Sequence, residues 1–199
     1  QDALGVTIDE NNKKLYNEDM SDVKPIVYLD MDGVLADFFG GVELLYGVEH
    51  WKQLTNDKTK DLKQEVINRI QGTDFFAVLP KFPTADALID MVKEFTGGKF
   101  SINTSPLRGD HENSAKYKKL WISNNIQKPD DIIVTGRKES YATDKASGTP
   151  NILIDDRPIN IQRWQGAGGF GILYQANRDS LDKVKKALDQ YGKQKGNNE

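Results

Sequence analysis

At 199 residues the chain is long enough for one substantial core with a small inserted subdomain, whereas two full domains would fit poorly. Hydrophobic residues make up 37% and charged residues 29%, which favours a globular protein over a disordered or fibrous one. A net charge of −3 argues against binding of a nucleic-acid polymer, and the absence of cysteine excludes disulfides and thiolate chemistry.

No apolar run approaches the ~20 residues that span a bilayer, and the N-terminus lacks the basic and apolar regions of a signal peptide. We therefore expect a soluble, cytoplasmic protein with no membrane partner, and the sequence leaves a homodimer open. Residues 1–24 are expected to form a polar arm and residues 192–199 a disordered tail, because neither has enough apolar surface to bury.

Short apolar runs rich in β-branched residues alternate with longer stretches of helical periodicity. This pattern predicts a Rossmann-like α/β fold, in which helices cover both faces of a parallel sheet. The expected strands cover residues 25–30, 99–104, 131–135, 151–155 and 169–174. The expected helices lie near 84–96, 112–125 and 179–191. Together they form a core domain over residues 25–39 and 83–191.

The segment 40–82 interrupts this alternation, because it holds two helix-like stretches near 40–47 and 57–71 and no strand of its own. We expect it to be a small helical cap inserted after the first strand.

Polar residues end several of the expected strands, and ligands in open α/β sheets bind at the carboxyl ends of the strands. These residues are Asp30, Thr104, Thr135 and Asp155. Asp30 and Asp32 stand two residues apart, so both side chains lie on one side of an extended chain, and Gly33 then permits a sharp turn. One carboxylate could attack while the other moves a proton. By itself DMDG also fits a plain strand exit with an Asx turn.

Asp155 and Asp156 form a second acidic pair, whose repulsion a divalent cation would relieve. Oxygen ligands with no cysteine and few histidines favour Mg²⁺ as this cation. Viewed alone, the pair also fits solvated acids beside Arg157.

The ordered set of motifs resembles the haloacid dehalogenase (HAD) superfamily. Its first motif, DxDG, is matched by the residues from Asp30 to Gly33, and its second motif by Thr104 in INTSP. Lys145 in TDKAS resembles the lysine of the third motif, and IDDRP at 154–158 resembles the acidic fourth motif. The runs LDMDGVLADF, DFFAVLPKFPTA, TSPL and LIDDRP further resemble the 5'(3')-deoxyribonucleotidase family.

The resemblance implies phosphoryl transfer from a small phosphomonoester, a nucleoside monophosphate in that family, to the nucleophile Asp30. Asp32 would protonate the leaving oxygen and later deprotonate water. Mg²⁺ would be held by Asp30, the backbone carbonyl of Asp32, and Asp155 or Asp156.

Thr104, Ser105 and Lys145 would hold the phosphate in this scheme. Lys138, which directly follows a strand in VTGRK, competes with Lys145 for the lysine role. Lys118 is a candidate to border the pocket and meet phosphate or base edges, but the preferred interpretation is a charge on a helix surface.

Four residues are candidates for binding the rest of the substrate. Phe38 and Trp51 could stack on a nucleobase, and Arg108 and Arg157 could border the pocket. Two alternatives remain open at this point. One is a phosphatase for another phosphomonoester, such as a sugar phosphate, and the other is a non-catalytic binding protein on the same fold.

Overall fold

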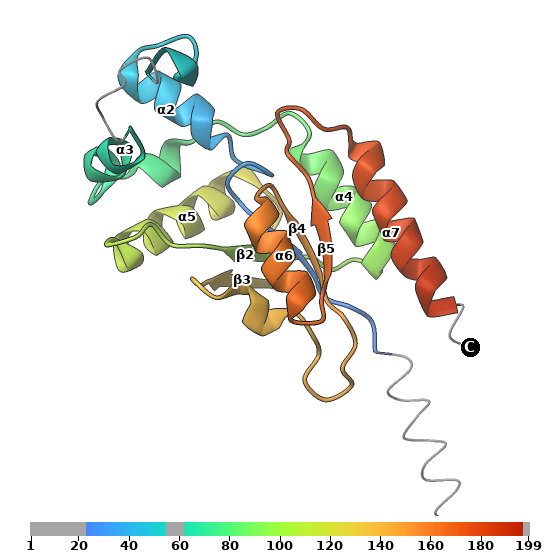
Figure 1. Cartoon of the computed structure of the whole chain (residues 1–199). Coiled ribbons are helices and arrows are strands. Elements are labelled where there is room, and N and C mark those ends of the chain that lie inside the picture. Colours follow the sequence, from blue (N-terminus) through green and yellow to red (C-terminus); the bar gives the residue numbers. More distant parts are fainter. Residues whose placement is uncertain (1–22, 55–61, 197–199) are drawn as a thin grey trace, which may run out of the picture.

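The structure is a computed structural model that describes residues 23–54 and 62–196 (Figure 1). The arm expected over residues 1–24 therefore lies almost entirely outside the described residues. Among the residues that are described, no helix combines the length and the apolar character needed to cross a membrane.

Five parallel strands form a single sheet in the order β3-β2-β1-β4-β5. Their bounds are β1 Val27–Leu29, β2 Ser101–Thr104, β3 Asp131–Val134, β4 Ile152–Asp155 and β5 Phe170–Leu173. All five lie within the segments expected from the sequence. Because β1 runs between β2 and β4, the residues that follow these three strands meet at the middle of one sheet edge.

Helices cover both faces of this sheet, as predicted (Figure 1). Side chains alternate along β1, so Val27 and Leu29 face one side and Tyr28 the other. The first side is covered by α4 Ala85–Thr96, α5 His111–Asn125 and α7 Leu181–Gly196. The second is covered by α6 Pro158–Gly166 and the 3-10 helix η3 Lys138–Tyr141.

Two of these helices differ from expectation. Helix α6 was not predicted, because its nine residues offer only a short apolar stripe on which Ile161 and Trp164 are buried. Helix α7 was expected to end at residue 191 but continues to Gly196, so the tail expected from residue 192 begins in helical conformation.

The inserted cap stands over the carboxyl edge of the sheet, at the upper left of Figure 1. It contains α2 Phe38–Tyr46, η1 Trp51–Leu54, α3 Leu62–Ile70 and η2 Phe75–Val78. Helix α2 begins two residues before the expected boundary at 40, with the Asp37 side chain accepting a hydrogen bond from the Gly40 N–H at 2.9 Å. The start expected for the second cap helix, residue 57, lies outside the described residues.

The chain enters and leaves the cap through two neighbouring backbone segments. The Asp37 N–H donates to the Pro80 carbonyl at 2.8 Å, and the Phe82 N–H donates to the Leu35 carbonyl at 2.9 Å. Close packing also fixes α2, because a Cβ at Gly41 would lie 2.3 Å from the side chain of Leu79. This pairing places the cap directly above the residues that follow β1.

Candidate active site

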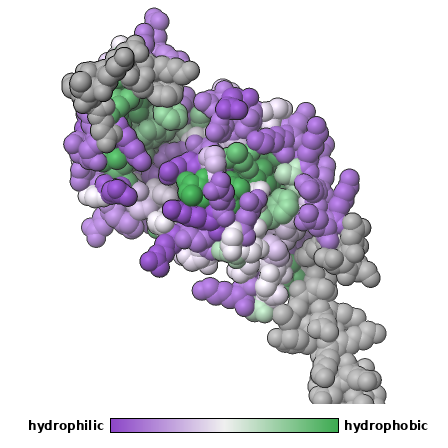
Figure 2. Space-filling model, in the orientation of Figure 1, coloured by the Kyte–Doolittle hydropathy of each residue, from purple (hydrophilic) through white to green (hydrophobic). Residues whose placement is uncertain are grey.

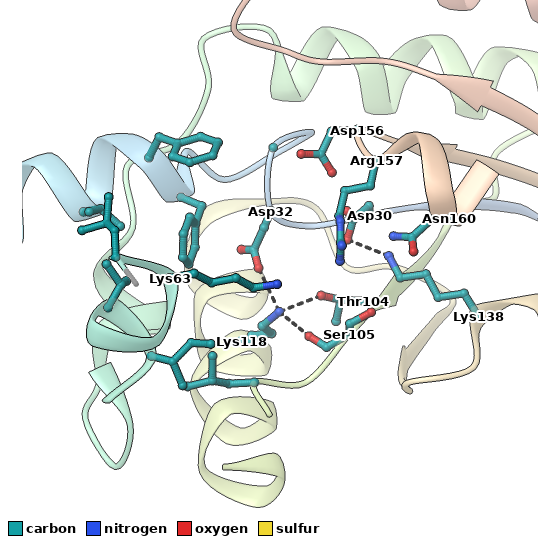
Figure 3. A pocket seen from close by; sticks show the side chains of 18 of the residues that line it. Asp30, Asp32, Lys63, Thr104, Ser105, Lys118, Lys138, Asp156, Arg157 and Asn160 are labelled. Carbon is teal, nitrogen blue, oxygen red and sulfur yellow. Dashed lines mark hydrogen bonds and ion pairs between the residues drawn. The ribbon is translucent and has the colours of Figure 1, made fainter. Parts of the chain in front are cut away.

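A cavity of about 570 Å³ lies between the carboxyl edge of the sheet and the cap (Figure 3). The core contributes most of its polar lining, including Asp30, Asp32, Thr104, Lys118, Lys138 and Asp156. The cap contributes an apolar wall that includes Phe38, Phe39, Val42, Leu54, Val66 and Ile67. Residues that lie far apart in the sequence therefore meet in one pocket.

Asp30 directly follows β1 and is buried, with 6% of its surface exposed. Its Oδ1 accepts hydrogen bonds from the Met31 N–H at 2.8 Å and lies 3.0 Å from Lys138 Nζ. The turn that follows requires glycine, since Gly33 has φ of 81° and a Cβ there would lie 2.2 Å from Asp156 Oδ2. The DMDG sequence thus forms a tight loop that brings the two acidic clusters into contact.

Three carboxylates, those of Asp30, Asp155 and Asp156, each place an oxygen within 4.8 Å of the others. Burial raises the pKa of Asp30 well above its ordinary value, and repulsion from Asp155 adds to the rise, against a lowering by Lys138. Burial and the Asp155 charge likewise raise the pKa of Asp156 to about 6. The cluster is therefore poorly compensated by the protein alone and matches the hard oxygen donors that Mg²⁺ prefers.

The two acids of the fourth motif differ in what they contact. Asp155 is fully buried, and both of its oxygens accept hydrogen bonds from Asn160 Nδ2 at 3.1 Å. It also accepts from Lys138 Nζ at 2.7 Å and from the Arg157 N–H at 2.9 Å. Asp156 instead lines the cavity. Asp156 is thus the carboxylate of the pair that is open to a ligand, while Asp155 orients its neighbours.

The preference for Lys145 as the lysine of the site is wrong, because the structure places Lys138 there instead. Lys138 is buried between Asp30 and Asp155, at 3.0 Å and 2.7 Å. Although burial alone would lower the pKa of Lys138, these two carboxylates outweigh it and raise the pKa. Lys145 is exposed and does not line the cavity.

The chain path after β3 explains this difference between the two lysines. Helix η3 begins at Lys138 and turns its side chain back to the sheet edge. The following segment folds on itself, since Thr143 pairs with Pro150 and the Asp144 N–H donates to the Thr149 carbonyl at 2.8 Å. Lys145 occupies the far end of that excursion, in solvent.

The interpretation of Lys118 as a surface charge is also wrong. Lys118 has 2% of its surface exposed, and its Nζ contacts Asp32 Oδ2 at 2.9 Å, Thr104 Oγ1 at 3.0 Å and the Ser105 carbonyl at 2.6 Å. The ammonium also lies 4.6 Å from the centre of the Phe76 ring. Figure 3 shows these contacts converging beside the cavity.

A sequence signal for Lys118 did exist. The buried residues of α5 are Ser114, Lys118, Trp121 and Ile122, which is the spacing of a single inward helix face. A lysine on the same stripe as two large apolar residues has to be paired inside the protein.

One oxygen of the Asp32 carboxylate accepts a hydrogen bond, and the other does not. Its Oδ2 accepts the Lys118 hydrogen bond, whereas Oδ1 is buried and has no hydrogen-bond partner within the described part of the chain. Thr104 and Ser105, which were predicted to bind phosphate, both line the same cavity. The carboxyl ends of β1 and β2 thus bring together the acid, the hydroxyl groups and a lysine.

Of the residues predicted to bind the rest of the substrate, some line the cavity and others do not. Phe38 lines the cavity and packs edge to face on Phe75 with ring centres 5.6 Å apart. Arg157 also lines the cavity. Trp51 begins η1, but its side chain lies outside the described residues. The expectation that Arg108 borders the pocket is not met, because Arg108 is exposed and is not among the residues that line the cavity, whereas its neighbour Leu107 is.

Two further lining residues, Asn160 and Lys63, were not predicted as site residues. Asn160 lies in the first turn of α6, a helix that the sequence did not reveal. Lys63 lies in the cap and belongs to no sequence motif, so the sequence alone did not indicate that it lines the cavity.

Comparisons with known proteins agree with this geometry. Residues 24–188 match the family model described as "5' nucleotidase, deoxy (Pyrimidine), cytosolic type C protein". No curated protein matches in sequence.

Solved structures with a similar fold include a magnesium complex of a HAD family enzyme from Bacteroides thetaiotaomicron, at 15% identity and a TM-score of 0.46, covering 81% of this chain and 98% of that one. A second is a HAD-superfamily hydrolase from Ehrlichia chaffeensis, at 15% identity and a TM-score of 0.45, covering 83% of this chain and 96% of that one. On the family match, the chain belongs to the deoxy (pyrimidine) 5' nucleotidase, cytosolic type C family, and is a phosphoric monoester hydrolase.

Proposed function

We propose that the protein is a magnesium-dependent phosphatase that hydrolyses nucleoside monophosphates through a phosphoaspartate at Asp30. The observation that carries the proposal is the convergence of the Asp30, Asp155 and Asp156 cluster with Thr104 and Lys118 on one cavity beneath an apolar cap. Two buried acids and a half-buried third that repel one another favour a site that binds a cation and an anionic substrate over a purely structural role.

The first step uses Asp30 as the nucleophile. Its Oδ1 is held by the Met31 N–H and Lys138, which fixes the carboxylate and leaves the second oxygen to attack phosphorus. A bond forms between that oxygen and phosphorus while the bond from phosphorus to the ester oxygen breaks. Asp32 gives its proton to the departing oxygen, so that the nucleoside leaves as a neutral alcohol.

The second step reverses the role of Asp32. Having lost its proton, the carboxylate can accept one from a water molecule that attacks the phosphoaspartate. The bond between phosphorus and the Asp30 oxygen then breaks, which releases inorganic phosphate and regenerates both carboxyl groups. The Oδ1 atom of Asp32 that lacks a partner among the described residues is the free position for this proton.

Asp30 and Asp156 would hold Mg²⁺, with Asp155 fixing Lys138 and Asn160 beside them. When bound, Mg²⁺ would offset the repulsion between an anionic nucleophile and an anionic phosphate. Thr104, Ser105 and Lys118 would hold the phosphoryl oxygens, since positioning and charge neutralisation account for most of the catalysis of phosphoryl transfer.

The character of the cap favours a nucleoside over a sugar as the leaving group. The described cap residues that line the cavity are apolar except for Lys63, and Phe38 and Phe39 stand among them. Figure 2 shows hydrophobic surface, in green, in the region of the cap. The hydroxyl groups of a sugar phosphate would lose their hydrogen bonds to water against such a wall, whereas a planar base can stack on it.

A substrate panel tests the proposal. Purified protein should hydrolyse nucleoside 5'- or 3'-monophosphates in the presence of Mg²⁺ much faster than hexose or pentose phosphates, and EDTA should abolish this activity reversibly. Equal and feeble rates on every ester, or activity that persists in EDTA, would contradict it.

A further inference from the structure

Lys63 in cap helix α3 is a cationic side chain that the proposed chemistry does not yet use. Figure 3 shows it reaching out of the cap across the cavity, toward the pair formed by Asp32 and Lys118. Lys63 makes no ion pair or hydrogen bond with any residue that the structure describes, whereas Lys118 and Lys138 are each paired with a carboxylate. It is therefore available to an anion that enters the pocket.

The direction of Lys63 follows from the phase of its helix. Leu62, Lys63, Val66 and Ile67 all line the cavity, and this spacing defines one face of α3. The opposite face carries Glu65 and Asn68, which are exposed and do not line the cavity. A lysine that served only solubility would belong on that outer face.

Lys63 and Lys118 approach the same cavity from opposite walls. The Lys118 ammonium is already paired with Asp32, whereas the Lys63 ammonium has no carboxylate partner among the described residues, so an anion bound between the two walls would neutralise the Lys63 charge. The space is also bordered by Thr104 and Ser105, at the carboxyl end of β2, where phosphate is proposed to bind. A phosphate dianion is the ligand whose charge and oxygen count satisfy both walls.

We propose that Lys63 is a substrate-binding residue that contacts a phosphate oxygen from the cap side, so that the phosphate links the cap to the core. This proposal rests on the phosphate position given under the proposed function. It assigns to the cap a part in holding the phosphate, in addition to its apolar contacts with the leaving group. The ammonium would act on any phosphomonoester, whatever group the phosphate carries.

Binding of inorganic phosphate in the presence of Mg²⁺ tests this directly, by titration calorimetry on the full chain. Lys63→Gln should raise the Kd for phosphate by about 10-fold or more, the size expected for one charged hydrogen bond, and Lys63→Arg should restore most of the affinity. Lys185→Gln, which removes an exposed lysine on α7 far from the cavity, is the matched control and should bind phosphate as the wild type does.

A kinetic comparison supplies the second readout. In Lys63→Gln, kcat/KM should fall by a similar factor for a nucleoside monophosphate and for p-nitrophenyl phosphate, which share only the phosphate. An unchanged Kd for phosphate in Lys63→Gln, or a loss confined to the nucleotide, would overturn the assignment. If phosphate binding depends on Lys63 but the wild type turns over no nucleotide, the nucleotidase proposal fails and the role of Lys63 stands.

Discussion

The ammonium of Lys118 lies 2.9 Å from the carboxylate of Asp32, a contact that joins helix α5 to the loop after β1 across 86 positions of sequence. The same ammonium contacts Thr104 and the Ser105 carbonyl, so a single cation organises the proposed acid and the proposed phosphate site. Removal of this ammonium should cost much more free energy than removal of an exposed lysine, because it would leave a partly buried carboxylate without its partner.

We expect Lys118→Met to lower kcat/KM by about 10²- to 10³-fold, since one charge-stabilising donor is removed from the phosphoryl group. Lys119→Met changes the adjacent exposed lysine and should leave activity within twofold of the wild type. Steady-state kinetics on a nucleoside monophosphate measures both. Similar rates for the two variants would contradict the role of Lys118.

Lys138 and Lys145 form a second matched pair of substitutions. Lys138→Met leaves Asp30 and Asp155 buried without their cation, so we expect a loss of about 3 kcal/mol or more in the free energy of unfolding of the metal-free protein at pH 7. Lys145→Met should change it by less than about 0.5 kcal/mol, because that lysine is in solvent. Denaturant unfolding in EDTA measures both values, and an effect of Lys145→Met as large as that of Lys138→Met would count against the placement.

Asp30→Asn should lower turnover by about 10⁴-fold or more, because an amide cannot form the phosphoenzyme. The folded state should persist, since the substitution removes a buried charge that has an unfavourable environment. Asp189→Asn, on the exposed surface of α7, is the control. An Asp30→Asn protein that retains full magnesium-dependent activity would eliminate the mechanism.

Asp32→Asn should reveal proton transfer through its dependence on the leaving group. We expect kcat/KM to fall by about 10²- to 10⁴-fold for a nucleoside monophosphate, whose alkoxide needs a proton to depart. The fall should be much smaller for the phosphorylation step with p-nitrophenyl phosphate, whose leaving group departs as an anion. A burst experiment separates this step from hydrolysis, and an equal loss for both esters would remove Asp32 from the role of acid.

The raised pKa of Asp156 gives stability a defined pH dependence in the absence of metal. Its value of about 6 in the folded protein exceeds the ordinary 3.8, so folding favours the protonated carboxyl. The contribution of Asp156 to stability is therefore complete below about pH 4 and is lost as the pH rises through about 6. By pH 7 the loss is on the order of 3 kcal/mol.

Denaturant unfolding of wild type and Asp156→Asn in EDTA measures this contribution. The unfolding free energy of the wild type should fall relative to that of the variant between pH 4.5 and 7. Adding Mg²⁺ at pH 7 should stabilise the wild type and not the variant, because the cation offsets the repulsion among the three acids. If the unfolding free energies of the two proteins changed with pH in parallel, the pKa of Asp156 would not be raised in the folded protein.

Much of the fold could be predicted from the sequence, for a local reason. Each strand lies in a short run that contains isoleucine and other apolar residues, and the runs alternate with helices long enough to show periodicity, as in α4. Helix α6 was not predicted, because nine residues with two buried side chains show too weak a hydrophobic periodicity. The end of α7 was misplaced because its last turn is polar and its helical conformation follows from the preceding turns.

The acids of the candidate site were predictable for a similar reason, because Asp30 and Asp155 are fixed by the ends of their strands, and the parallel topology brings strand ends together. The lysines were predictable only in part. Lys118 shares the inward stripe of α5 with Trp121 and Ile122, which is a signal in the spacing, whereas the choice between Lys138 and Lys145 depends on the path of the loop after β3, which does not follow from spacing along the chain.

The sequence by itself determined the strands of the sheet and the strand ends that carry Asp30, Asp32, Asp155 and Asp156, since these depend on short-range pattern, and the order of its motifs indicated the catalytic class by resemblance to a family. Only the tertiary structure decided that Asp155 is saturated by protein donors while Asp156 faces the cavity, and that Lys138 and Lys118 line the cavity beside these acids. The physical reason is that the direction of a side chain is set by the packing of its element against all the others.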